Sequence, residues 1–143
     1  MSTKIIDGVE YSISERMLIK CPETYEGVFT IPSTVRTICN RAFRCCDKLT
    51  SVSIPDNVTK IGSGVFVRCS GLRNVYIPAS VEEIGTYLFI DCSDQLQVYC
   101  EAEKAGERWN KYWNIVTKNP KDSNLSVTYG VPRSWYEKFV AQK

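Results

Sequence analysis

The sequence predicts an α/β repeat solenoid, in which short coils of the chain stack into one domain. Two observations lead to this expectation: a unit of 23 residues occurs three times, and each unit contains an alternating, β-branched segment. A chain of 143 residues that is 43% hydrophobic suits a single domain with a buried core. We expect an N-terminal cap over residues 1–25, three full coils and a partial one over 26–100, and a C-terminal cap and tail over 101–143.

The repeat is visible as columns of matching residues at a spacing of 23. Each copy follows the pattern L-x-x-V-x-I-P-x-x-V-x-x-I-G-x-x-x-F-x-x-C. One copy cannot bury its own apolar side chains, so the copies must stack and bury them together. The clearest columns are Ile31, Ile54 and Ile77; Ile38, Ile61 and Ile84; Phe43, Phe66 and Phe89; and Cys46, Cys69 and Cys92.

Each copy is expected to contribute one strand to a parallel sheet on one face of the solenoid. The Leu-x-x-Val-x-Ile segment is short, alternating and β-branched, as such strands are. The proline that follows lacks a hydrogen-bond donor and ends the strand. Gly62 and Gly85 indicate a tight turn before the next inward-facing residues, with Cys39 in place of glycine in the first copy. An extra residue before Leu96 indicates that the last coil gives way to a cap.

The segments that flank the repeats are expected to cover its open ends. Residues 9–13 alternate in polarity and precede Leu18 and Ile19, which predicts a small hairpin over the first coil. Residues 101–114 predict a helix, because Trp109, Tyr112 and Trp113 have the spacing of one helical face. We interpret this aromatic face as a lid over the last coil.

The tail predicts a loop, a strand and a short helix. Residues 119–124 are rich in turn formers, residues 125–129 alternate like a strand, and Ser134 begins the helical segment. Trp135, Phe139 and Val140 share one face of that helix. We expect this face to pack on the array as a second cap, and contact with a partner is the alternative.

The repeat over residues 29–92 resembles the BspA-type (Treponema-like) leucine-rich repeats, which are common in gut bacteria and their mobile elements. The segment around Val98, Trp109 and Asn114 is also similar to the way such arrays end. The resemblance implies a right-handed solenoid, a bacterial or mobile-element origin and a role in binding. Several members of that family are surface adhesins, which usually carry a signal peptide or an anchor.

The composition argues against catalysis. The chain contains no histidine, which excludes Ser-His-Asp triads, Cys-His pairs and histidine metal sites. The paired carboxylates Glu82 and Glu83 lie in columns whose charge changes sign from copy to copy, as expected of a solvated face. Glu101 and Glu103 are the other such pair, and the chain has no phosphate-binding loop or nucleophile elbow. We expect a protein that is not an enzyme and has no cofactor and no metal.

The seven cysteines allow two interpretations. Three of them form one repeat column, where a small buried apolar side chain is sufficient explanation. The alternative is a thiol- or zinc-dependent protein, although the cysteine spacing matches no common zinc motif. Cys45 is the candidate for a reactive thiol, since its equivalents in the other copies are Arg68 and Asp91.

Charge and hydropathy limit the partners and the compartment. The net charge of +2 argues against a dedicated nucleic-acid binder, and no apolar run is long enough to span a membrane. The N-terminus has no apolar core of a signal peptide, which predicts a cytoplasmic protein. If a signal upstream of this sequence has been removed, the prediction changes to a secreted or cell-surface protein.

The outward side of the predicted sheet is the candidate surface for binding another protein. Four strands at about 4.8 Å, with three residues of about 3.3 Å along each strand, give a face of roughly 200 Å², whereas a stable interface needs about 800 Å² per partner. The sheet must therefore recruit coil edges, the C-terminal region or a second copy in a homodimer. The function predicted is a protein-interaction module, such as a small intracellular binder or stoichiometric inhibitor, and the alternative is an adhesin fragment. The candidate partner-binding residues are Arg73, Asn74, Tyr76, Gln97, Tyr99 and Trp135.

Overall fold

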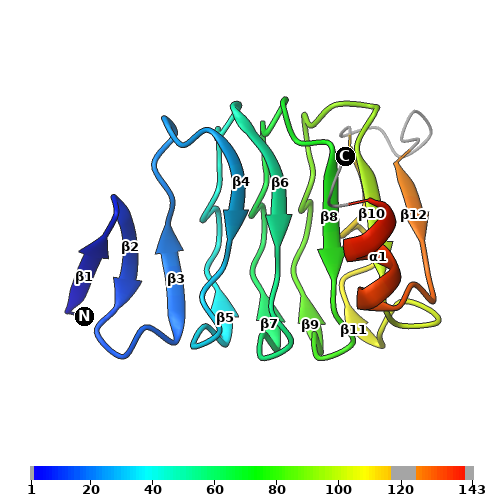
Figure 1. Cartoon of the computed structure of the whole chain (residues 1–143), viewed down its shortest axis with the longest axis horizontal. Helices are drawn as coiled ribbons and strands as arrows, with labels where there is room; N and C mark the ends of the chain where they lie inside the picture. The colour runs from blue at the N-terminus through cyan, green and yellow to red at the C-terminus, as the bar shows by residue number, and fades with distance from the viewer. Residues whose placement is uncertain (1, 117–124, 141–143) are drawn as a thin grey trace.

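A computed structural model describes residues 2–116 and 125–140, and it shows a row of stacked coils with one helix lying across it (Figure 1). Each successive coil adds one strand to each of two sheets, a five-stranded sheet and a seven-stranded sheet. The predicted solenoid is therefore confirmed. Within the described residues, no helix has the length and apolar character needed to cross a lipid bilayer.

The five-stranded sheet contains the strands that the repeat predicts. Every neighbouring pair is parallel, and residues one repeat apart lie side by side, so Val52 pairs with Val75 and Val75 with Val98. The predicted strand in the tail joins this sheet at its C-terminal edge. In spatial order the strands are β12 (Ser126–Thr128), β10 (Gln97–Cys100), β8 (Asn74–Ile77), β6 (Leu49–Ser53) and β4 (Gly27–Thr30).

The seven-stranded sheet was not predicted as a sheet, because most of its strands are two residues long and too short to show alternation. The predicted N-terminal hairpin is present: β1 pairs with β2 and β2 with β3, both antiparallel. β3 then pairs in parallel with β5, which places Leu18 beside Ile38. The order is β1 (Thr3–Ile6), β2 (Val9–Ser12), β3 (Met17–Lys20), β5 (Thr37–Ile38), β7 (Lys60–Ile61), β9 (Glu83–Ile84) and β11 (Arg108–Trp109).

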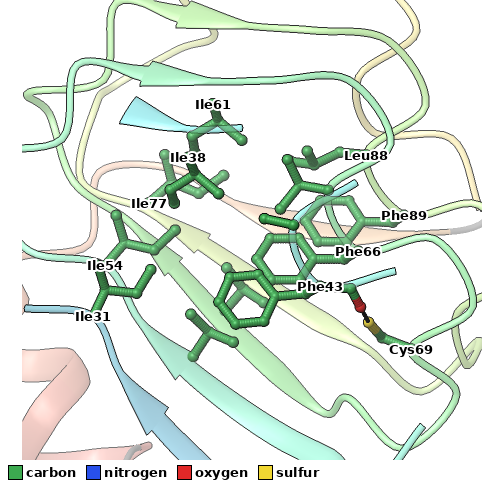
Figure 2. Close-up of a cluster of buried hydrophobic side chains, with 14 of the residues drawn as sticks. Ile31, Ile38, Phe43, Ile54, Ile61, Phe66, Cys69, Ile77, Leu88 and Phe89 are labelled. Carbon is green, nitrogen blue, oxygen red and sulfur yellow. Dashed lines mark hydrogen bonds between the residues drawn. The ribbon is translucent and has the colours of Figure 1, made fainter. Parts of the chain in front are cut away.

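The core consists of the repeat columns, which run through the stack between the two sheets (Figure 2). The rings of Phe43 and Phe66 stack with centroids 5.3 Å apart, and those of Phe66 and Phe89 with centroids 5.6 Å apart. All three side chains are fully buried. A continuous aromatic column of this kind links the coils, so each ring stabilises both of its neighbours.

Glycine is required at two positions where neighbouring coils approach closely. A Cβ atom on Gly62 would lie 2.3 Å from Oδ1 of Asn40, and one on Gly85 would lie 2.3 Å from Oγ of Ser63. Those two oxygens accept hydrogen bonds from the backbone of the next coil, at Ser63 and Thr86. The predicted turns are present, and their glycines provide room for these side chain-to-backbone bonds.

The helix predicted over residues 101–114 is wrong. The segment forms β11 and turns that add a further coil, in which Trp109 pairs with Ile84 and the ring of Trp113 lies 6.3 Å from that of Phe89. Both tryptophans are buried and end the core, as a lid would, whereas Tyr112 is exposed. The prediction failed because the inward positions of a coil are also spaced four residues apart here, as on a helical face.

The tail places one helix on the outward side of the five-stranded sheet (Figure 1). α1 (Arg133–Phe139) begins one residue before the predicted start at Ser134, and β12 lies within the predicted strand segment. The predicted loop over residues 119–124 lies outside the described residues.

Candidate functional site

The outward side of the five-stranded sheet carries the two columns of side chains that the repeat predicts. Their registers follow from strand pairing at each step between β4, β6, β8 and β10. The first column is polar apart from its first member, and the second ends in two tyrosines. The columns are Val28, Ser51, Asn74 and Gln97, and Thr30, Ser53, Tyr76 and Tyr99.

Helix α1 covers the C-terminal part of this face. Its inward residue, Tyr136, is only 3% exposed, and its ring lies 4.8 Å from that of Tyr76 and 5.4 Å from that of Tyr99. The Tyr136 hydroxyl donates a hydrogen bond of 2.7 Å to Oδ1 of Asn74. These contacts form a small second core, separate from the columns inside the coils.

Tyr76 is therefore not available to a partner, and the prediction that it is exposed is wrong. The side chain is fully buried, and its hydroxyl donates a 2.6 Å hydrogen bond to the carbonyl of Val131. Burial, the largest effect, raises the pKa of Tyr76 above its usual value, because the ionised phenol would lose its hydration. Tyr99 is half-buried under the same helix. Sequence reasoning missed this cover because it could not place the tail over the sheet.

Arg133 attaches the start of α1 to Tyr76 of β8 and to the segment that follows β6. Its guanidinium lies over the Tyr76 ring at 4.9 Å from the centroid. It also donates hydrogen bonds to the carbonyl of Ile54 at 2.6 Å and to Asp56 Oδ1 at 2.9 Å. Because these groups belong to the coils, Arg133 determines where the helix begins on the face.

The predicted packing face of α1 is wrong for Trp135 and Phe139 and right for Val140. Trp135 and Phe139 are 46% and 44% exposed, with ring centroids 5.3 Å apart, and Tyr136 packs toward the sheet together with Val140. Residues 135 and 139 and residues 136 and 140 both satisfy the i, i+4 spacing of a helical face. The sheet selects the second pair, because the Tyr136 hydroxyl finds an acceptor there.

The remaining candidate residues differ in their accessibility. Arg73, just before β8, and Gln97, the first residue of β10, are both exposed, and the Gln97 N–H donates to the Arg73 carbonyl at 2.9 Å. Asn74 is half-buried, and its Oδ1 also accepts a 2.8 Å hydrogen bond from the Ser51 hydroxyl. The exposed members of the predicted set are therefore Arg73, Gln97 and Trp135, and Phe139 joins them.

One member of each carboxylate pair takes part in a surface interaction. Glu83 forms an ion pair with Arg108 and lies 3.9 Å from Lys60. Glu101 accepts a 2.9 Å hydrogen bond from the backbone N–H of Ala79. Among the described residues, no three cysteine or carboxylate side chains are grouped so as to hold a metal ion.

The cysteine column connects the coils through thiol hydrogen bonds. Cys69 Sγ donates to the Phe43 carbonyl and Cys92 Sγ to the Phe66 carbonyl, each at 3.0 Å (Figure 2 shows the first). Burial raises the pKa of Cys69, and it raises the pKa of Cys92 to about 12. These thiols remain protonated at neutral pH and act as small core residues.

Cys45 is partly exposed, as Cys92 is, whereas the column thiols Cys46 and Cys69 are buried; it lies at a turn with a φ of 63°. We expect N-ethylmaleimide at neutral pH to modify Cys45 well before Cys69 and Cys92, because only the thiolate reacts and burial raises the pKa of both of those column thiols. Peptide mapping by mass spectrometry after brief labelling measures the order, and Cys45→Ser is the control that should remove the fastest phase. Equal rates at Cys45 and Cys69 would contradict this assignment.

Comparison with known families identifies the repeat. Residues 11–106, more than half of the chain, match the family model described as the BspA type leucine rich repeat region, with six copies. No curated protein matches the chain significantly.

Two solved bacterial structures are similar to the whole stack. One is a leucine-rich repeat protein from Eubacterium ventriosum, with 24% identity, a TM-score of 0.70 and 88% of this chain covered. The other, described as a leucine rich cell surface protein from Faecalibacterium prausnitzii, has 26% identity, a TM-score of 0.55 and 95% of this chain covered. The match covers only 39% and 41% of those two chains. This chain therefore corresponds to less than half the length of either one.

Proposed function

The chain belongs to the BspA-type leucine-rich repeat family, and from this we propose that it is a non-catalytic protein-interaction module. Its partner surface is centred on the outer side of α1, with Trp135 and Phe139 as the apolar anchors. Arg73, which precedes β8, and Gln97, the first residue of β10, contribute polar contacts at the margin. The observation that carries the proposal is the exposure of two large aromatic rings on a helix that is otherwise fastened to the sheet.

Exposed aromatic pairs of this kind are typical of protein interfaces. Tryptophan and arginine are enriched among the residues that dominate binding energy, and desolvating the two rings supplies the driving force. The inward contacts of Tyr136 and Arg133 hold the helix in place, so a partner meets a surface that is already ordered. The helix also adds area that the sheet alone lacks, which brings the surface closer to the size of a stable interface.

The binding takes place, in one version of this proposal, at the cell surface or outside the cell. The F. prausnitzii neighbour, 26% identical over nearly all of this chain, is described as a cell surface protein. Because the chain spans less than half of that neighbour, it corresponds on this proposal to one part of a larger surface protein. The cytoplasmic binder or stoichiometric inhibitor is the competing setting, and it is supported by the seven unpaired thiols.

Affinity capture with matched variants tests the surface. The immobilised protein is incubated separately with cytosolic extract and with detergent-solubilised envelope extract of the native organism. We expect wild type to retain a defined protein that the Trp135→Ala/Phe139→Ala variant loses by at least about tenfold, since two buried anchors are removed. The control, Ile5→Ala/Ile6→Ala, removes exposed apolar side chains at the other end of the stack. It should retain the partner.

The extract that supplies the partner, cytosolic or envelope, decides between the cytoplasmic setting and the cell-surface setting.

Equal retention of the partner by wild type and by the Trp135→Ala/Phe139→Ala variant would contradict the proposed surface. Circular dichroism of both variants should match wild type, because all four side chains are exposed.

A further inference from the structure

We propose that the turn edge of the stack contains a second binding site, a groove for a short, extended acidic peptide segment. The groove lies away from α1 and crosses three consecutive coils, with a volume of about 530 Å³. Three arginines, Arg41, Arg44 and Arg68, line it, and a single carboxylate, Asp91, accompanies them. This inference does not depend on the function proposed for α1.

The positive charge of the groove is largely uncompensated. Neither Arg41 nor Arg44 forms an ion pair with any residue in the described part of the chain. Arg68 lies 3.8 Å from Asp91, but both side chains are more than half exposed, so their attraction is weak. Lys20 adds a further positive charge beside the groove, since its Nζ donates to the Arg44 carbonyl at 3.2 Å.

The backbone beneath the arginines is held rigidly by hydrogen bonds between coils. The N–H of Arg41 donates to the Ser63 carbonyl at 3.0 Å, and the N–H of Arg68 donates to the Ile90 carbonyl at 2.9 Å. The Gly64 N–H donates the equivalent hydrogen bond to the Thr86 carbonyl at 2.9 Å. A ligand therefore does not need to order the turns, although it must still order the arginine side chains.

The spacing of the charges and the lining of the groove fit an extended peptide. Adjacent coils are about 4.8 Å apart, so two coil steps span roughly 10 Å, the length of about three extended residues. Arg44 and Arg68 lie on consecutive coils, within reach of carboxylates on alternate residues of one strand-like segment. Guanidinium groups bind carboxylates through two parallel hydrogen bonds, which favours arginine over lysine at such a site.

The far end of the groove can accommodate the rest of the peptide. Gly64, Val67 and Ile90 form an apolar part of its lining, and Tyr87 borders it at 43% exposure. The Tyr87 ring stacks on that of Tyr112 at 6.0 Å, which holds it in position. A peptide that carries a carboxylate on every second residue and small side chains between them matches both the charges and the apolar lining.

Fluorescence polarisation with a labelled peptide of alternating glutamate and alanine tests this site on the full chain. We expect saturable binding that weakens with added salt, and no binding of the matching glutamine–alanine peptide. The Arg44→Glu/Arg68→Glu variant should bind at least about tenfold more weakly, because two charge-assisted contacts are lost. The control, Arg16→Glu/Arg36→Glu, makes the same change in charge at exposed arginines that do not line the groove. It should stay within about threefold of wild type.

Three results would overturn the proposal. The first is equal weakening by the groove variant and the control, which would mean that net charge alone attracts the peptide. The second is equal binding of the two peptides. The third is binding of inorganic phosphate or a sulfated oligosaccharide at the groove without binding of the acidic peptide. Should the glutamate variant fail to fold, Arg44→Gln/Arg68→Gln removes the same contacts with a smaller change in charge.

Discussion

Replacing Phe66 with alanine is expected to lower the free energy of unfolding by about 3–5 kcal/mol. Phe66 is the middle ring of the aromatic column, fully buried and stacked on Phe43 and Phe89 at 5.3 and 5.6 Å. The substitution removes both stacking contacts and leaves a cavity that the coils on either side cannot close. Urea unfolding followed by tryptophan fluorescence measures the loss.

Phe139→Ala is the matched control for this measurement, because it removes the same ring from a site that is 44% exposed. We expect it to change the free energy of unfolding by less than about 1 kcal/mol. If both substitutions cost the same, the aromatic column does not hold the coils together in the way described.

Replacing Tyr136 with alanine is expected to release α1 from the sheet while the coils stay folded. Tyr136 is the only buried residue of the seven-residue helix. A helix this short is not stable on its own and depends on the contacts that fasten it. Without the Tyr136 ring and its hydrogen bond to Asn74, we expect trypsin to cleave after Arg133 and Lys138 at least about tenfold faster. Intact-mass analysis of timed digests measures the rate.

Trp135→Ala provides the control for tryptic release, since the neighbouring side chain points away from the sheet and is 46% exposed. Its cleavage rate should match that of wild type. The Tyr136→Ala variant should also lose less stability in urea than the Phe66 variant, because the small core under α1 is separate from the main one. Unchanged cleavage in Tyr136→Ala would show that the helix is held by something else.

The repeating part of the fold could be predicted because each column of the core repeats in the sequence. Residues 23 positions apart became direct strand neighbours, as with Ser51 and Asn74. The two-residue strands of the other sheet left no periodic signal, since a strand needs several residues to show alternation. Trp109 and Trp113 led to the wrong prediction of a helix, because these two inward positions of the last coil are four residues apart, the spacing found on a helical face.

The surface was harder to predict than the core, because it depends on where a non-repeating segment comes to rest. The register correctly placed Tyr76 and Tyr99 on the outward side of the sheet. Nothing in the repeat indicates that the tail returns to cover them, and helical spacing alone allowed Trp135 or Tyr136 to face inward. The basic groove was also missed, since its arginines occupy different positions of the repeat and meet only when the coils stack.

Hydroxyl-radical footprinting of the wild-type protein tests most directly the claim that α1 covers the sheet and presents its aromatic pair. Tyrosines can be compared with one another, because their intrinsic reactivity is the same. We predict strong oxidation of Tyr87, which is 43% exposed, and of Trp135, with almost none at Tyr76, which is fully buried. Oxidation of Tyr76 at the rate of Tyr87 would contradict the account, since it would mean that the outward face of the sheet is open.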